Sequence, residues 1–247
     1  MHSHLFGRLR QNATLLFLIM FFPTLTLAAG PCSDLPSHAD LRQALTDIAV
    51  DETAGDNGGF GLNMWGTIVN RDGEVCAVAF TGDDRGDQWP GSRVISAQKA
   101  NTANAFSLPG LALSTAMLFS LVQPDGSLFG LQASNPVDVD VAYGGDSRNN
   151  GQHNDPMVGK KIGGVNVFGG GLALYDAAGV LIGAIGVSGD ASCTDHVIAW
   201  RTRTLLELDS TPSNDNIIFD IAPDANGHLV SASGFGHPSC GAPVIVP

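Results

Sequence analysis

The sequence has few basic residues, no closely spaced pair of cysteines and, after residue 29, no long apolar run. It carries 12 Lys and Arg against 24 Asp and Glu, a formal net charge of −12. This charge repels phosphate groups, which argues against nucleic acid or an anionic membrane surface as a partner. Without an apolar run of about 20 residues, no membrane-inserted helix is predicted after residue 29. Without paired cysteines, neither a zinc site nor a dithiol redox motif is predicted.

The first 29 residues have the pattern of a secretory signal peptide. Histidines and arginines at positions 2, 4, 8 and 10 precede the apolar run Leu15–Phe22, and the small residues Ala28 and Ala29 follow. A charged start, a short apolar middle and a small-residue end are typical of such a signal. We therefore expect the mature chain to be exported, either to the periplasm or to the extracellular medium.

All four cysteines, Cys32, Cys76, Cys193 and Cys240, follow this segment. An even number of cysteines in an exported chain predicts two disulfides, and three connectivities are open. The predicted order of elements favours Cys193–Cys240, which would tie the C-terminal tail to the last helix. It also favours Cys32–Cys76, which would tie the first helix to a sheet.

Hydrophobic periodicity and turn residues predict helices and strands in a mixed order. The Asp72-Gly73 turn, for example, lies between two β-rich runs and predicts a hairpin. The predicted helices cover residues 39–50, 92–106, 111–121 and 194–208. The predicted strands cover residues 62–69, 75–80, 165–175, 180–187 and 216–221.

The segment 123–161 is rich in Pro, Gly, Asn and Asp and has no periodic apolar pattern. A connection this long inside a compact domain usually has a function, so we expect it to form the wall of a site. Its acidic residues do not have the spacing of a calcium loop, and a solvated acidic loop is the better interpretation. The residues concerned are Asp138, Asp140, Asp146 and Asp155, together with His153.

We predict one domain over residues 30–208 with this insertion, followed by an extension over residues 209–247.

Ser188 follows a glycine-spaced strand, as the nucleophile of a hydrolase does. The strained turn of such enzymes reads Gly-x-Ser-x-Gly, whereas this one reads Gly186-Val187-Ser188-Gly189-Asp190. The second glycine is one position early, and Asp195 and His196 follow only seven and eight residues after Ser188. Triad partners normally come from separate elements. The pattern therefore argues against a catalytic serine.

The chain resembles a known haem-binding family in two stretches, SAQKANTANAF at 96–106 and IGGVNVF to GVLIGAIGVSGDASCTDHVIAWRTR at 162–203. The family is the one named for GlcG and HbpS, also called the haem-degrading domain. The resemblance covers residues 38–208 and implies a profilin-like α/β/α sandwich with a central antiparallel sheet. It also implies assembly into homo-oligomers and binding of haem as cofactor, and in some members haem breakdown or redox-linked sensing.

The resemblance suggests a set of ligand-binding residues. Lys99 would supply a cation and Thr102 an oxygen, and Arg93 would pair with a haem propionate through its planar guanidinium. The backbone N–H groups of the turn before the last helix would hold a carboxylate, and His196 would ligate the haem iron. The full set is Arg93, Lys99, Thr102, Gly163, Gly164, Ser188, Gly189 and Asp195, with His196 as the metal ligand.

Each assignment has a structural alternative. Lys99 would then be a surface lysine, Arg93 would pair with a neighbouring aspartate at 83, 84 or 87, and His196 would pack against the tail. Asp195 would stabilise the N-terminus of its own helix.

The leading hypothesis from the sequence is an exported haem- or tetrapyrrole-binding protein that acts as a carrier, scavenger or sensor. Two alternatives stay open. One is an enzyme on the same scaffold that acts on a small acidic or hydroxylated molecule. The residues in acid–base or anchoring roles would be Lys99, Arg93, Asp195 and His196. The other is an interaction module without a small ligand.

Overall fold

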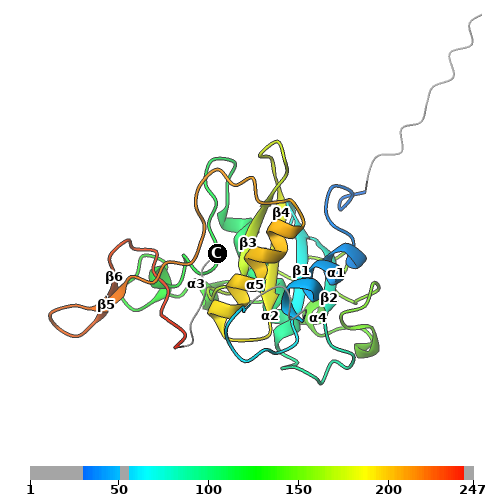
Figure 1. Ribbon diagram of the computed structural model, residues 1–247, viewed down its shortest axis with the longest axis horizontal. Coiled ribbons are helices and arrows are strands. Elements are labelled where there is room, and N and C mark those ends of the chain that lie inside the picture. Colours follow the sequence, from blue (N-terminus) through cyan, green and yellow to red (C-terminus); the bar gives the residue numbers. More distant parts are fainter. Residues whose placement is uncertain (1–29, 51–55, 242–247) are drawn as a thin grey trace, which may run out of the picture.

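The computed structural model of this chain describes residues 30–50 and 56–241, and the predicted signal peptide lies outside them. Figure 1 shows a central sheet with helices on both faces. Its strands are β1 (Trp65–Asn70), β2 (Val75–Phe80), β3 (Gly171–Tyr175) and β4 (Leu181–Ser188). They lie in the order β2-β1-β4-β3, and every neighbouring pair is antiparallel.

Helices cover both faces of this sheet. Helix α2 (Ser92–Phe106) packs on one face against β1, β3 and β4, whereas α1 (His38–Ala49) and α5 (Ser192–Leu205) pack together on the other. Two hydrophobic clusters fill the layers, because successive side chains of a strand point to opposite faces. In β1, Trp65 and Val69 belong to the α2 layer and Ile68 to the α1/α5 layer. The predicted α/β/α sandwich with an antiparallel sheet is therefore confirmed.

Helix α2 lies unusually close to β4. A Cβ atom at Gly186 would stand 1.9 Å from the carbonyl oxygen of Ser96 on α2. Only a glycine permits such an approach of helix backbone to strand, and the alanines Ala97, Ala100 and Ala103 keep the facing side of α2 thin. This contact fixes α2 relative to the end of β4.

The helix predicted over residues 111–121 is not present. This stretch forms turns, followed by the short 3-10 helix η2 (Ser120–Val122). Thr115 in this stretch is bound to β3, since Thr115 N donates to Gly171 O at 3.0 Å and Gly171 N donates to Thr115 Oγ1 at 2.8 Å. These contacts between distant residues replace the local helical hydrogen bonds that the apolar spacing suggested. The strand predicted from residue 165 likewise begins only at Gly171.

The insertion 123–161 forms a folded layer with short helices, α3 (Leu131–Ser134), α4 (Val139–Ala142) and η3 (Ser147–Asn149). Ala142 and Met157 are fully buried in the α2 layer. The expectation of a solvated acidic loop is wrong for Asp155, which is 2% exposed and paired with Arg93. The pairing bridges 62 residues of sequence, which local charge patterning does not reveal.

Both predicted disulfides, Cys32–Cys76 and Cys193–Cys240, are present. The extension carries a separate two-stranded hairpin, β5 (Ile221–Pro223) and β6 (Leu229–Ser231), so the strand predicted over 216–221 begins only at its last residue. A buried ion pair between Arg203 of α5 and Asp215 ties the extension to the domain. Among the described helices, none is long and apolar enough to cross a membrane.

Candidate functional site

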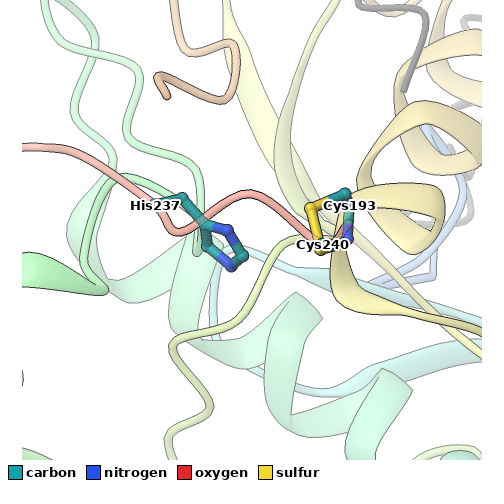
Figure 2. Close-up of side chains that lie close together, drawn as sticks. All are labelled: Cys193, His237 and Cys240. Atoms are coloured by element: carbon teal, nitrogen blue, oxygen red, sulfur yellow. A yellow bond between two sulfur atoms is a disulfide. The ribbon is translucent and has the colours of Figure 1, made fainter. Parts of the chain in front are cut away.

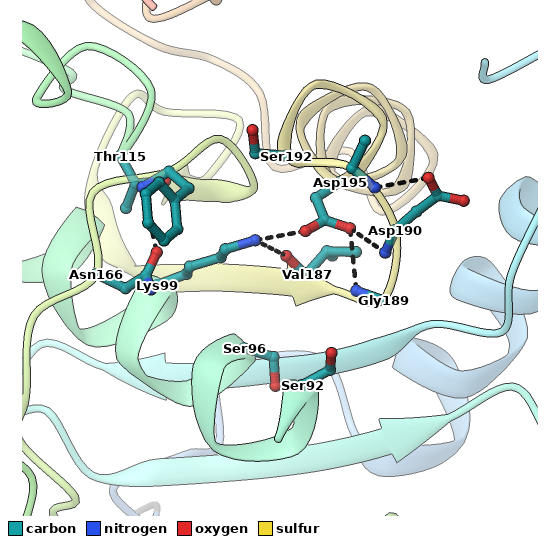
Figure 3. Close-up of polar contacts among 12 residues, drawn as sticks. Ser92, Ser96, Lys99, Thr115, Asn166, Val187, Gly189, Asp190, Ser192 and Asp195 are labelled. Carbon is teal, nitrogen blue, oxygen red and sulfur yellow. Dashed lines mark hydrogen bonds and ion pairs between the residues drawn. The ribbon is translucent and has the colours of Figure 1, made fainter. Parts of the chain in front are cut away.

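A buried ion pair lies where the end of β4 meets α2 and α5. Lys99 Nζ donates to Asp195 Oδ2 at 2.6 Å and to Val187 O at 3.0 Å. The two side chains are 1% and 3% exposed. Figure 3 shows the lysine reaching from α2 toward the first turn of α5. Lys99 is therefore not a surface lysine, and its charge is fully paired within the protein.

The second oxygen of the same carboxylate is held by the turn before α5. Asp195 Oδ1 accepts hydrogen bonds from Gly189 N at 3.0 Å and from Asp190 N at 2.8 Å. These are the backbone donors that the sequence assigned to a ligand carboxylate. In the structure, the anion that they bind is the chain's own Asp195 (Figure 3). A ligand that reaches this turn meets an occupied anion site.

Burial shifts both members of the pair toward their neutral forms. It raises the pKa of Asp195 to about 6, although Lys99 and the backbone donors act in the opposite direction. It lowers the pKa of Lys99, an effect that Asp195 counteracts. Desolvation penalises the charged form of each group. A carboxyl group with a pKa near neutrality and a cleft beside it is a candidate for binding or proton transfer.

A cleft of about 350 Å³ lies over this pair. Two aromatic side chains at its rim remain accessible, Trp89 at 55% and Phe168 at 42% exposure. Serine hydroxyls and a second carboxylate add polar groups to the wall. The lining residues are Trp89, Ser92, Ile95, Lys99, Phe168, Ser188, Asp190, Ser192 and Asp195.

Three of the residues assigned from sequence, Lys99, Ser188 and Asp195, line the cleft, whereas the backbone N–H of Gly189 is bonded to Asp195 behind it. Within the described residues, no hydrogen bond joins the side chain of Ser188 to a histidine or to a carboxylate, and Ser188 pairs with Trp65 in the sheet. No catalytic triad is formed there.

The other assigned residues, including Gly189 and His196, lie outside the cleft lining. Arg93 is paired with Asp155, so the alternative of an ion pair holds, but with a different partner from the aspartates at 83, 84 and 87. Thr102 Oγ1 donates to Gln98 O and accepts from Asn166 N. Gly163 and Gly164 form a turn with positive φ between the insertion and residue 165.

His196 is buried in α5, with no exposed surface. Its Nε2 accepts a hydrogen bond from Ile217 N at 3.1 Å, which joins the ring to the extension. Burial lowers its pKa to about 3. The packing alternative describes this environment, since Nε2 is already engaged and the ring faces protein on all sides.

Sequence reasoning missed much of the cleft wall. Trp89 precedes α2 in a Trp-Pro-Gly turn, and Phe168 lies 79 positions later in an irregular segment. An exposed aromatic residue beside a proline-glycine turn was the available signal for Trp89. Phe168 had none, because its place depends on how residues 165–170 cross over α2.

A family model described as haem-degrading protein HbpS-like matches residues 39–203. The chain belongs to this family. All residues that line the cleft fall inside the matched range. No curated protein matches the chain.

Several solved structures have a similar arrangement. A PduOC–haem complex shares 23% identity with a TM-score of 0.48, covering 72% of this chain and 98% of its own. The protein ORFY of Klebsiella pneumoniae shares 22% identity with a TM-score of 0.45, covering 77% and 96%. A double mutant of HbpS from Streptomyces reticuli shares 14% with a TM-score of 0.44, covering 78% and 99%.

Haem is the cofactor that membership of the HbpS-like family implies, and the cleft meets some of its requirements. Trp89, Phe168 and Ile95 offer apolar faces for a macrocycle, while the serine hydroxyls offer donors for carboxylates. Among the described residues that line the cleft, none is a histidine, cysteine, methionine or tyrosine, the usual axial ligands of haem iron. The cleft therefore fits the macrocycle and its carboxylates but not conventional iron ligation.

A larger hollow of about 560 Å³ lies between residues 119–126 and the extension. His228 lines it, but this side chain is 73% exposed and its partner Asp224 lies on the same hairpin. This hollow includes residues beyond the matched range and contains no buried charged pair. The smaller cleft is therefore the candidate functional site.

Proposed function

We propose that this chain is an exported protein that binds haem or another tetrapyrrole in the Trp89–Phe168 cleft and acts as a carrier, scavenger or sensor. The observation that carries the proposal is the pair of exposed aromatic side chains above the buried lysine, all within the family-matched region. Aromatic contacts and burial supply affinity for a flat apolar ring. The serine hydroxyls of the cleft wall can donate to its carboxylates.

Two disulfides support export, because such bonds persist in oxidising compartments. Assembly into homo-oligomers stays a prediction, which light scattering of the purified protein tests.

Since the cleft offers no usual axial ligand, the macrocycle and its carboxylates should dominate the affinity. We therefore expect hemin and iron-free protoporphyrin IX to bind with dissociation constants within about tenfold of each other, a difference of about 1.4 kcal/mol. Titrations of the oxidised protein, followed by hemin absorbance and by porphyrin fluorescence, measure both. Failure of both ligands to saturate would reject the proposal.

Substitution of the aromatic rim tests the location. Trp89→Ala and Phe168→Ala should each weaken hemin binding about tenfold, through lost ring contact and burial. Phe129→Ala removes an aromatic side chain that is 68% exposed on the insertion, and His228→Ala alters the larger hollow. Both controls should bind like the parent. Loss of affinity in His228→Ala alone would move the ligand to the larger hollow.

A second candidate function is an enzyme that acts on a small acidic or hydroxylated molecule. The observation in its favour is Asp195 with a pKa of about 6 beside a cleft at the small end of ligand pockets. Such an enzyme would show turnover that Lys99→Met abolishes and that Phe129→Ala leaves intact. Screening small hydroxy acids with the parent and these two variants distinguishes it from a binding protein.

A further inference from the structure

A second group of chemically reactive side chains lies beside α5, apart from the ion pair. The Sγ atoms of Cys193 and Cys240 and a ring nitrogen of His237 all lie within 4.8 Å of one another. Figure 2 shows the histidine and Cys240 on the extension, and Cys193 on α5. His237 and Cys240 lie beyond the family-matched residues 39–203. The cluster is thus a feature of this chain's extension.

The imidazole of His237 is already oriented for ligation. Its Nδ1 lies 2.8 Å from Pro238 O, which has only lone pairs, so Nδ1 carries the proton and donates it. Nε2 then keeps its lone pair and lies 3.3 Å from Ser192 Oγ, which is itself 3.6 Å from Cys240 Sγ. A backbone carbonyl on the far nitrogen is the usual second partner of a metal-binding histidine. The ring is 2% exposed and packs against Phe119.

The two cysteines form a disulfide in this structure, and a disulfide sulfur is a poor metal ligand. Reduction would change this. Cys193 lies in the first turn of α5, a helix of 14 residues, and the N-terminus of a helix stabilises a thiolate. Reduction would therefore leave two thiol groups close to the imidazole ring of His237.

We propose that reduction of Cys193–Cys240 converts this cluster into a Zn²⁺ site with the ligands Cys193 Sγ, Cys240 Sγ and His237 Nε2. A phosphine reductant takes up oxygen from one water molecule, and the disulfide becomes two thiols. Zn²⁺ then displaces two thiol protons, which pass to solvent, and binds the two thiolates and the imidazole. Two sulfurs and one nitrogen, with a fourth position left for water, suit tetrahedral zinc.

The spacing of the ligands allows this conversion without a change of fold. Two thiolates on tetrahedral zinc stand about 3.8 Å apart, as follows from Zn–S bonds of about 2.3 Å. A ring nitrogen of His237 and the two sulfurs lie within 4.8 Å already, so we expect changes of side-chain rotamer to be sufficient. Ser192 contacts both His237 Nε2 and Cys240 Sγ and also lines the cleft. Zinc at this position would therefore alter one wall of the cleft.

The test uses the full mature chain carrying Cys32→Ser and Cys76→Ser, so that only one disulfide is present. Oxidised and phosphine-reduced samples are dialysed against Zn²⁺, desalted and assayed for bound metal, and Co²⁺ replaces Zn²⁺ for absorption spectra. We expect about one Zn²⁺ per reduced chain, none per oxidised chain, and a thiolate-to-Co²⁺ charge-transfer band in the reduced form. Equal zinc content in the two forms, or no such band, would overturn the proposal.

His237→Ala in the same background should weaken Zn²⁺ binding at least tenfold, whereas His228→Ala, an exposed histidine on the neighbouring hairpin, should not change it. Unchanged affinity in His237→Ala would show that two thiolates alone bind the metal and would refute the three-ligand site. Circular dichroism of each variant establishes that it is folded. The Co²⁺ spectrum of the protein that carries only Cys32→Ser and Cys76→Ser tests thiolate ligation even where a histidine variant fails to fold. Hemin binding by the oxidised parent is a separate measurement, so this site and the proposed function stand or fall independently.

Discussion

Helix α2 carries two buried ion pairs that differ in their surroundings. Arg93 donates to both carboxylate oxygens of Asp155 and to Ala142 O, and Asp155 also accepts from Gly151 N and Met157 N. Lys99 has a single carboxylate oxygen and one carbonyl as partners, and a cleft lies beside it. The first pair joins the insertion to the domain, whereas the second lies in the wall of the candidate cleft. Two pairs of similar burial on one helix therefore have different roles.

The largest expected effect comes from breaking the first pair. Arg93→Ala leaves the Asp155 carboxylate buried without its cation, and loss of one partner of a buried pair costs about 3–5 kcal/mol. Urea unfolding should show a loss of this size, while hemin affinity changes little in the folded variant. A loss below about 1 kcal/mol would mean that the insertion is held by its apolar contacts alone.

Lys99→Met should destabilise the protein by about 2–4 kcal/mol at pH 8, because it strands the charge of Asp195. Protonation of Asp195 relieves that cost. Its folded pKa already exceeds the ordinary value and rises further without the lysine, so the folded variant binds a proton more tightly than the unfolded chain. The loss should therefore be at least about 1 kcal/mol smaller at pH 5 than at pH 8. Urea unfolding at both pH values checks this, and an equal loss at both would contradict it.

His196 should make the protein sensitive to acid in the opposite sense to Asp195. Its folded pKa is about 3 and its ordinary value about 6.5, so the unfolded chain binds the extra proton between these values. The contribution is present above pH 6.5 and is lost as pH falls toward 3, by up to about 1.4 kcal/mol per pH unit. The difference in unfolding free energy between the parent and His196→Gln isolates it. A difference independent of pH would show that the ring takes up its proton at the same pH in the folded protein as in the unfolded chain, contrary to the lowered pKa.

The smallest effect is expected from the exposed pair Arg148–Asp146 of the insertion, whose side chains are 83% and 42% exposed. Arg148→Ala should leave the midpoint of urea unfolding unchanged, because solvent screens such pairs. A measurable loss would indicate that the insertion depends on surface charge as well as on Arg93–Asp155.

The sequence predicted elements where local signals agree with the fold and failed where distant contacts decide. The alanine-rich pattern located α2 from Ser92 to Phe106, since propensity and packing favour the same state there. The helix expected over 111–121 was lost to pairing with Gly171. The motif around Lys99 and Asp195 pointed to the right region, but no sequence pattern shows that the two side chains meet.

The partner of Arg93 illustrates the same limit. Three aspartates lie within ten residues of it in sequence, yet the carboxylate that it binds comes from the insertion. Similarly, the turn donors at Gly189 and Asp190 were recognised as an anion site, but their occupant proved to be internal. The sequence indicated which charged groups and backbone donors could bind an ion, but not which carboxylate each of them contacts.

The missing side chain at Gly186 has a mechanical consequence for the cleft. Because the backbone of α2 rests directly on β4 there, the wall formed by Ser92, Ile95 and Lys99 has no layer of side chains that could compress or rearrange. A ligand wider than the cleft must therefore be accommodated by displacement of residues outside α2, such as Phe168 or Ser192. The α2 wall of the cleft is therefore the stiffer one, and the side with Phe168 and Ser192 sets the width of ligand that the cleft accepts.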